Sequence, residues 1–163
     1  MIRVADRRDA AAIAAIYAAE VLEGTATFEI EPPTAAEIAQ RMTVDGGRLP
    51  WLVWDEAGAV LGYAYASGYR ARAAYDRTVE TTVYVARGAQ GRGVGRQLYA
   101  ALLDRLIAAG FAQALGVIAL PNEASVALHE ASGFRQVARL ERMGYKFGRR
   151  LDVGYWQRAL ART

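Results

Sequence analysis

The sequence predicts a mixed α/β fold built as one domain over residues 1–163. Three observations support this fold class. The chain has 163 residues, which is long enough to bury a sizeable core. Hydrophobic residues make up 53% of it, which argues against an intrinsically disordered chain. Strand-like and helical hydrophobic patterns follow one another without a linker, a repeat or a low-complexity segment.

The first half of the chain predicts two helices among four strands. Asp6 and Asp9 favour a helix start by capping and by complementing the helix dipole, and Thr34 caps a second helix. The segment 55–58 is typical of a hairpin turn, and the segment 69–76 is expected to be irregular. The predicted strands are residues 2–5, 51–54, 60–67 and 78–85, and the predicted helices are residues 7–21 and 34–42.

The second half predicts two further helices and three strands. Val94, Leu98, Leu102 and Leu106 line one side of a helix, and Gly110 stands where a C-terminal cap belongs. Asn122 is suited to begin the next helix, which Gly133 ends, and Tyr99 and Tyr145 are core candidates. The predicted helices are residues 94–109 and 122–132, and the predicted strands are residues 115–120, 134–143 and 151–160, the last two joined through residues 144–150.

Composition excludes several functional classes. The chain has no cysteine, which excludes disulfides and thiolate chemistry and suits a reducing cytoplasm. A single histidine excludes a multi-histidine metal site, so we expect no metal. The net charge is only +3 and the arginines are scattered, so we expect no nucleic-acid partner. The N-terminus does not read as a signal peptide, and no apolar run is long enough for a membrane span.

The segment from Val83 to Arg96 predicts an anion-binding site. It reads as a strand, a glycine-rich turn and the start of a helix. Glycines let the backbone approach a ligand closely, and the free N–H groups at a helix N-terminus bind negative charge. We therefore expect a phosphate-bearing ligand, the alternative being a tight turn with a helix cap.

Two of the three phosphate loops that compete for this segment do not fit it. A Walker A loop needs Lys-Ser or Lys-Thr after the glycines, and neither is present. A dinucleotide fingerprint needs a third glycine where the chain has Leu98. The third pattern, Q/R-x-x-G-x-G/A, fits Gln90-Gly91-Arg92-Gly93-Val94-Gly95 at every position.

With this pyrophosphate loop, the chain resembles the GCN5-related N-acetyltransferases (GNAT). A second cofactor motif of that superfamily is similar to residues 122–125 and 129–134. Residues 69–75, 79–85 and 146–153 resemble the phosphinothricin/methionine sulfoximine N-acetyltransferase subfamily. The resemblance implies the GNAT fold: a central, twisted, mostly antiparallel sheet whose splayed parallel strand pair binds acetyl-CoA, with helices on both faces.

The resemblance also implies which residues bind acetyl-CoA. Backbone N–H groups of the loop would bind the pyrophosphate, the preceding strand would pair with the pantetheine arm, and Asn122 would contact that arm, although an N-cap role suits Asn122 equally well. The implied cofactor residues are Val83, Tyr84, Val85, Gln90, Gly91, Arg92, Gly93, Val94, Gly95, Arg96 and Asn122.

Two residues are catalytic candidates. Acetylation requires an uncharged amine, so a base must accept a proton, and the resemblance points to Glu80. Period two puts Glu80, Thr82 and Tyr84 on one face of their strand. An exposed face or an ion pair is the alternative reason for this carboxylate. His129, the only histidine, falls where related enzymes often carry a tyrosine that protonates the departing thiolate; it is either an acid/base or a pocket-wall residue.

The acceptor site is implied by the resemblance alone. Arg70, Arg72 and Tyr75 match the subfamily's substrate loop, where arginine suits a carboxylate or phosphinate; a solvated basic loop is the alternative. Phe28 would supply an apolar wall. Subfamily members are commonly homodimers, and Lys146 lies in a segment near the pocket that a partner subunit could contribute.

The preferred function is transfer of the acetyl group of acetyl-CoA to the α-amine of a small amino-acid-like acceptor such as phosphinothricin or methionine sulfoximine. Direct attack in a ternary complex is expected, since there is no cysteine to carry the acetyl group. One alternative is another acceptor: an amino acid, a polyamine, an aminoglycoside or a protein N-terminus. The other is a CoA-binding module without turnover.

Overall fold

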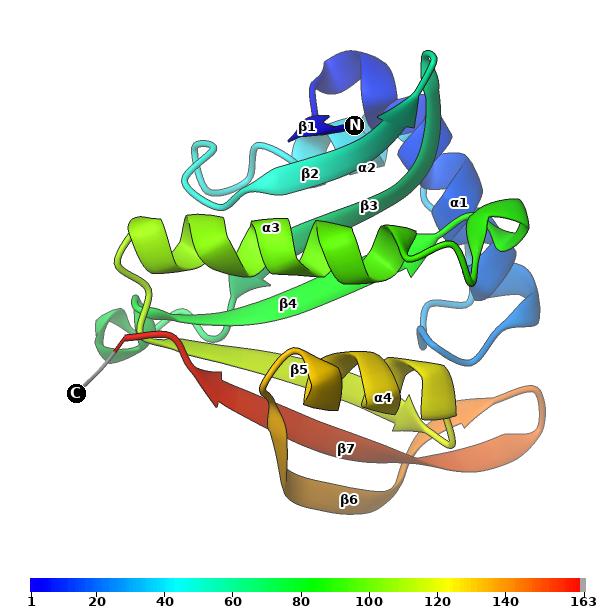
Figure 1. Cartoon of the computed structure of the whole chain (residues 1–163). Coiled ribbons are helices and arrows are strands. Elements are labelled where there is room, and N and C mark those ends of the chain that lie inside the picture. The colour runs from blue at the N-terminus through cyan, green and yellow to red at the C-terminus, as the bar shows by residue number, and fades with distance from the viewer. Residues whose placement is uncertain (162–163) are drawn as a thin grey trace.

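One seven-stranded sheet organises the protein, with helices on both faces (Figure 1). The computed structural model describes residues 1–161. The strand order is β1-β2-β3-β4-β5-β7-β6, and every pair is antiparallel except β4–β5. The mixed α/β fold predicted from the sequence is confirmed. The strands are β1 Ile2–Val4, β2 Trp51–Glu56, β3 Ala59–Gly68, β4 Thr78–Val85, β5 Gln113–Leu120, β6 Arg135–Lys146 and β7 Arg149–Ala159, and the helices are α1 Ala10–Glu23, α2 Ala35–Arg41, α3 Val94–Ala108 and α4 Glu123–Ala131.

Each face of the sheet has its own hydrophobic core. Helix α3 packs on one face through the predicted row of Val94, Leu98, Leu102 and Leu106, all of which are buried. Helices α1 and α2 cover the other face, where Ile13 and eight other buried residues form a second cluster. Within residues 1–161, no helix combines the length and the hydropathy needed to cross a membrane.

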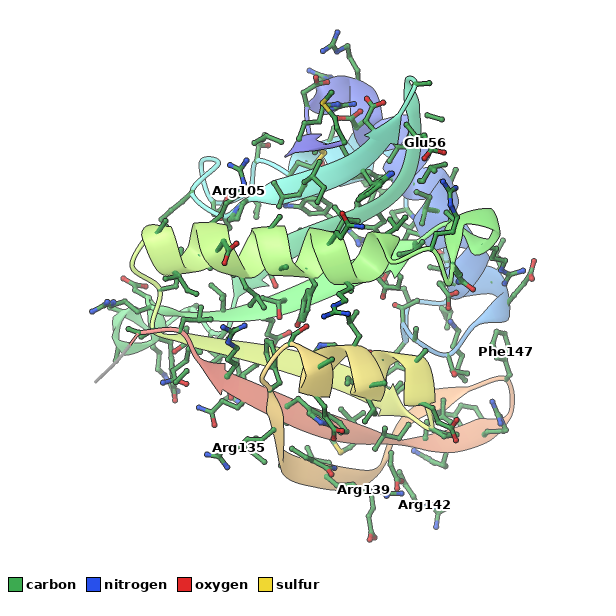
Figure 2. The ribbon with its side chains drawn as sticks, viewed as in Figure 1. Glu56, Arg105, Arg135, Arg139, Arg142 and Phe147 are labelled. Atoms are coloured by element: carbon green, nitrogen blue, oxygen red, sulfur yellow. The ribbon has the colours of Figure 1, made fainter. Side chains whose placement is uncertain are left out.

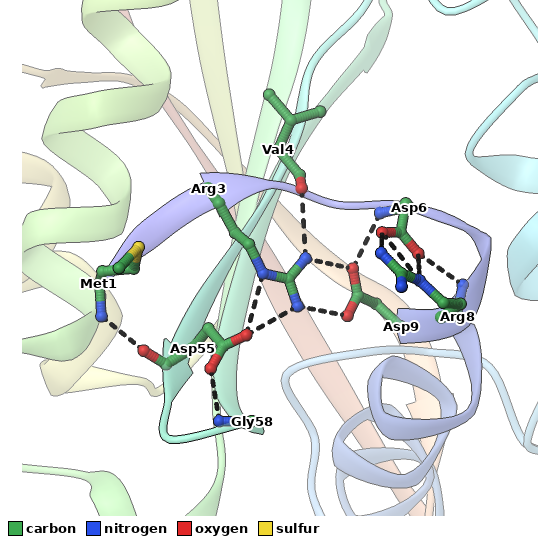
Figure 3. Close-up of polar contacts among 8 residues, drawn as sticks. All are labelled: Met1, Arg3, Val4, Asp6, Arg8, Asp9, Asp55 and Gly58. Carbon is green, nitrogen blue, oxygen red and sulfur yellow. Dashed lines mark hydrogen bonds and ion pairs between the residues drawn. The ribbon is translucent and has the colours of Figure 1, made fainter.

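A charged cluster attaches the short strand β1 to its neighbours (Figure 3). The guanidinium of Arg3 donates two hydrogen bonds to Asp9, at 2.7 and 2.8 Å, and one to Asp55 at 2.9 Å. Asp9 also accepts from the backbone N–H of Asp6, and Asp55 accepts from that of Gly58. The cluster thus links β1, the start of the first helical segment and the β2–β3 hairpin.

The last two strands are longer than the sequence predicts. Strand β6 ends at Lys146 and strand β7 begins at Arg149. The connection is therefore a two-residue turn at Phe147 and Gly148, both with positive φ, rather than residues 144–150. Gly144 lies inside β6, paired with Leu151, and the ring of Phe28 covers it: a Cβ there would lie 2.1 Å from the ring. The expectation of a core position for Tyr145 is wrong, since its side chain is 64% exposed on the edge strand.

The two parallel strands part soon after they pair. β4 and β5 are in register only at residues 78–80 and 113–115. At the point of divergence the Thr81 hydroxyl donates to the Leu115 carbonyl (3.2 Å) and lies 2.6 Å from the Tyr99 hydroxyl of α3. Side chains therefore replace the backbone pairing there, while β4 stays paired with β3 and β5 with β7. The splayed pair implied by the resemblance is present.

Candidate functional site

A cavity of about 620 Å³ lies between the splayed strands. It is bounded by β4, β5, the glycine-rich loop, the beginning of α4 and the end of α1 with the residues after it. The predicted cofactor residues that line it are Val83, Tyr84, Val85, Gln90, Gly91, Gly93, Val94, Gly95, Arg96 and Asn122. The structure thus brings together ten positions from three separate segments of the chain.

The glycine-rich loop presents backbone donors to this cavity. Gly91 and Gly93 have φ values of 73° and 79°, which residues with a side chain rarely adopt. The Gln97 N–H donates to the Gly93 carbonyl (3.1 Å) and makes the first bond of α3. The N–H groups of Val94, Gly95 and Arg96 therefore precede the first helical bond and have no acceptor within the helix. This geometry suits an anion at a helix N-terminus.

Arg92 departs from the rest of the loop. Its guanidinium contacts Glu56 of the β2–β3 hairpin at 2.8 Å, and the residue does not line the cavity. Its side chain therefore attaches the loop to the sheet, and only its backbone is left for the predicted pyrophosphate contact.

The structure also places Asn122 as the N-cap of α4, because its side-chain oxygen accepts from the Ser125 N–H at 3.1 Å.

His129 lies in the wall of the cavity with one ring nitrogen unbonded. The residue is 4% exposed, and its Nδ1 is 2.7 Å from the Ser125 carbonyl. A carbonyl only accepts, so the neutral ring carries its proton on Nδ1. Nε2 is then a buried acceptor without a partner in residues 1–161. Burial lowers the pKa of His129, and the bond to Ser125 opposes this only in part.

Glu80 lies at the start of the splay, on the face predicted from strand periodicity. Thr81 faces α3, whereas Tyr84 contacts Tyr17 of α1 with ring centroids 5.2 Å apart. Burial raises the pKa of the Glu80 carboxyl, and the positive charge of Arg70 opposes this shift. No ion pair involving Glu80 is present in residues 1–161, so the ion-pair alternative does not account for it.

A second cavity, of about 520 Å³, lies on the Glu80 side of the sheet. Ser67, which is directly opposite Glu80 in the β3–β4 register, contributes to its wall. Trp51 and Tyr65 also line it and stack with ring centroids 4.1 Å apart. Glu80 itself lines neither cavity, but its neighbours Thr81 and Thr82 line the first and its cross-strand partner Ser67 lines the second.

The predicted acceptor residues do not line either cavity. Arg70 and Arg72 are exposed and Tyr75 is half-buried on the loop between β3 and β4. Arg70 stacks over Tyr69, whose ring contacts that of Tyr75. Phe28 lies on a different segment, with its ring over Gly144. The structure therefore brings Arg70 near Glu80 but does not gather these four side chains into one pocket.

Sequence reasoning missed two features of the site. Gly116, in the middle of β5, has the His129 ring so close that a Cβ would lie 2.2 Å from it. A lone glycine inside a strand pattern indicates such a close approach, so this signal was available. Lys146 contacts the end of α1 and the segment after it in its own chain, through the carbonyls of Glu20 and Thr27. Nothing local in the sequence indicates that contact.

Comparison with known proteins identifies the family. The family model described as "Acetyltransferase (GNAT) domain" matches residues 2–154. The chain belongs to the GNAT acetyltransferase family. The residues around the first cavity fit acetyl-CoA, the co-substrate of this family, since they supply N–H groups without a helical acceptor at the start of α3, a glycine at position 95 in the cavity wall, and a buried free acceptor on His129.

Relatives within this GNAT family cover nearly the whole chain. The chain is 44% identical to Phosphinothricin N-acetyltransferase of Streptomyces viridochromogenes, over 96% of this chain and 86% of that protein. It is 36% identical to the L-methionine sulfoximine/L-methionine sulfone acetyltransferase of Salmonella typhimurium, over 96% and 92%. The crystal structure of a GNAT phosphinothricin acetyltransferase from Sinorhizobium meliloti with acetyl-CoA matches at a TM-score of 0.94 and 42% identity, over 98% of this chain and 87% of that one. The predicted family, fold and enzyme class are confirmed.

Proposed function

We propose that this GNAT protein transfers the acetyl group of acetyl-CoA to the α-amine of a small amino-acid-like acceptor such as phosphinothricin or methionine sulfoximine. The observation that carries the proposal is Glu80, a half-buried carboxylate without an ion-pair partner in residues 1–161. Its strand neighbours Thr81 and Thr82 line the cavity that fits acetyl-CoA, and its cross-strand partner Ser67 lines the cavity walled by Trp51 and Tyr65. The names of the relatives support this acceptor class.

In this mechanism Glu80 removes the proton that blocks the amine. An ammonium has no lone pair, so the carboxylate accepts a proton before or during attack. Its raised pKa brings it closer to that of an efficient base at neutral pH. The nitrogen forms its bond to the acetyl carbon, the carbon–sulfur bond breaks, and the sulfur leaves with the electron pair. The loop N–H groups of Val94 to Arg96 hold the pyrophosphate.

His129 supports this mechanism from the opposite wall. Its Nε2 is a free acceptor next to the cavity, so a proton placed there has no competing partner among the described residues. The ring would take up on Nε2 the second proton that the nitrogen loses as the amide forms, and pass it to the leaving thiolate. Burial lowers the pKa of His129 and so favours the neutral ring, whose Nε2 is free to accept a proton.

A panel of amines tests the acceptor class. Release of CoA is measured with phosphinothricin, methionine sulfoximine, free amino acids, a polyamine and an aminoglycoside. We expect kcat/KM to be highest for the acceptors that carry a carboxylate. Release of CoA with polycations alone would indicate a polyamine or an aminoglycoside as the acceptor instead. No release of CoA with any amine would indicate a CoA-binding module without turnover.

Arg72 provides a sharper test of anion recognition. If its guanidinium binds the acceptor carboxylate or phosphinate, Arg72→Ala raises KM for that acceptor about tenfold with little change in kcat, since such bonds are charge-assisted. Arg135→Ala, which removes an exposed arginine at the far edge of the sheet (Figure 2), is the matched control. An unchanged KM in the Arg72 variant would refute the role of this loop.

We further propose that the protein is a homodimer that uses the edge strand β6. Five large apolar side chains are exposed on this strand and its turn, and isolated monomers rarely present so many together. They are Val137, Leu140, Met143, Tyr145 and Phe147. The molar mass in solution measures the oligomeric state.

A role in resistance to toxic amino-acid analogues, in the cytoplasm where acetyl-CoA is available, follows from the proposed acceptors.

A further inference from the structure

Lys146 is a buried lysine whose ammonium has no carboxylate partner within residues 1–161. The residue is 3% exposed and takes part in no ion pair there. Its Nζ donates to the Thr27 carbonyl at 2.9 Å and to the Glu20 carbonyl at 3.3 Å. Burial of an ammonium without an ion-pair partner is unfavourable, and burial lowers the pKa of Lys146, while the negative charge of Glu20 opposes this shift in part. A leucine or methionine would fill this space without that cost.

The two carbonyls belong to a segment that forms part of the cavity wall. Glu20 is in the last turn of α1, and Thr25 and Ala26 line the cavity at the splayed strands. The Thr27 hydroxyl lies 2.6 Å from the Tyr17 hydroxyl and accepts from the Glu29 N–H at 3.1 Å. Lys146 therefore connects the end of β6 to residues 20–29, which are more than a hundred positions away in the sequence.

A second contact from the same strand reaches the same segment. Gly144, two residues before Lys146, faces the same side and is covered by the ring of Phe28. Met143 and Tyr145 are exposed on the opposite side, and Phe147 stands at the turn that ends β6 (Figure 2). One side of β6 thus holds residues 20–29 through a charged group and through an aromatic ring.

We propose that Lys146 is a positioning residue for acetyl transfer, which holds residues 24–29 against the β6–β7 hairpin so that this segment closes the site. The inference rests on the proposed function and adds a residue to it. With the ammonium in place, Thr25 and Ala26 bound the cavity and Phe28 is fixed over Gly144. Without it, two carbonyls lose their donor and the segment is free to move away from the hairpin.

The test compares Lys146→Met with the unaltered protein. Methionine has a similar length but no donor. We expect KM for methionine sulfoximine to rise about tenfold, because loss of the charged hydrogen bonds releases Phe28, the predicted apolar wall of the acceptor site. The Kd for acetyl-CoA should change less than about threefold, since the backbone donors at α3 are untouched. Amide hydrogen exchange in residues 24–29 should become faster.

Two further variants keep the test decisive. Arg149→Met removes an exposed cation that faces Lys146 in the hairpin register, and it should leave KM and hydrogen exchange unchanged. Gly144→Ala places a methyl group into the Phe28 ring, and it should reproduce the faster exchange of residues 24–29. This variant also decides the question if Lys146→Met does not fold.

Two results would overturn the proposal: a lowered Tm for Lys146→Met with unchanged acceptor KM, or hydrogen exchange in residues 24–29 equal to that of the unaltered protein. Failure of the proposed function is a separate result. If the unaltered protein acetylates no amine, hydrogen exchange alone still shows whether Lys146 holds the segment, because that measurement needs no acceptor.

Discussion

The pKa values of the charged cluster around Arg3 shift in the opposite direction to those of Glu80 and His129, the two groups beside the cleft between the splayed strands β4 and β5. In the cluster, hydrogen bonds from Arg3 lower the pKa of Asp9, and the Gly58 N–H together with Arg3 lowers that of Asp55. In the cleft, burial raises the pKa of Glu80 and lowers that of His129. The cluster therefore favours the charged form of each group, whereas the cleft favours the neutral form.

Hydrogen-bond partners explain why the pKa shifts differ between the two regions. Asp9 is itself buried, but it has three donors within 2.8 Å, which compensate for the lost water. Glu80 and the Nε2 of His129 have lost water without gaining a partner among the described residues. The first arrangement stabilises the fold. The second costs stability and leaves groups ready to exchange a proton with a substrate, as expected at a catalytic site.

The largest effect expected is on catalysis when the unpaired carboxylate is removed. Glu80→Gln retains the shape of the side chain but removes the base, so kcat should fall about 10²- to 10⁴-fold. The Kd for acetyl-CoA, measured by calorimetry, should stay the same because Glu80 does not line that cavity. A kcat near that of the unaltered enzyme would remove Glu80 from the mechanism.

An intermediate effect is expected when the charged cluster is broken. Asp9→Asn should lower the free energy of unfolding by about 2 kcal/mol at pH 7, since it weakens charge-assisted bonds to Arg3. The pKa of Asp9 is lowered in the folded protein, so this stabilisation is present above the ordinary value of about 3.9 and is lost as the pH falls through the folded value.

Urea unfolding at pH 7 and at lower pH measures this loss. Arg8→Met, which removes the exposed ion pair with Asp6, is the control and should change stability by less than about 1 kcal/mol. Equal effects of the two substitutions would show that burial of Asp9 makes no difference.

The smallest effect expected has the opposite sign. The raised pKa of Glu80 means that its charged form is less favourable in the folded protein than in the unfolded chain. Glu80→Gln should therefore raise Tm slightly at pH 8. The gain should shrink as the pH falls and vanish below the ordinary glutamate value of about 4.3, where the carboxyl is protonated in both states. Calorimetric Tm values at pH 8 and pH 5 measure it, and a lower Tm at pH 8 would contradict the account of the cleft.

Where local chemistry decides the structure, the sequence determined it. The order of strand, glycine-rich loop and helix needs only neighbouring residues, as do the buried row of α3 and the N-cap at Asn122. Strand periodicity placed Glu80, Thr82 and Tyr84 on one face without knowledge of the fold. The loop motif then led to the GNAT family and hence to acetyl-CoA.

Only the tertiary structure decided what depends on distant segments. The side chain of Arg92 turns to Glu56, the ring of Phe28 covers Gly144, and Lys146 binds the carbonyls of Glu20 and Thr27. Such contacts join residues tens to more than a hundred positions apart, and periodicity or spacing within a short window carries no information about them.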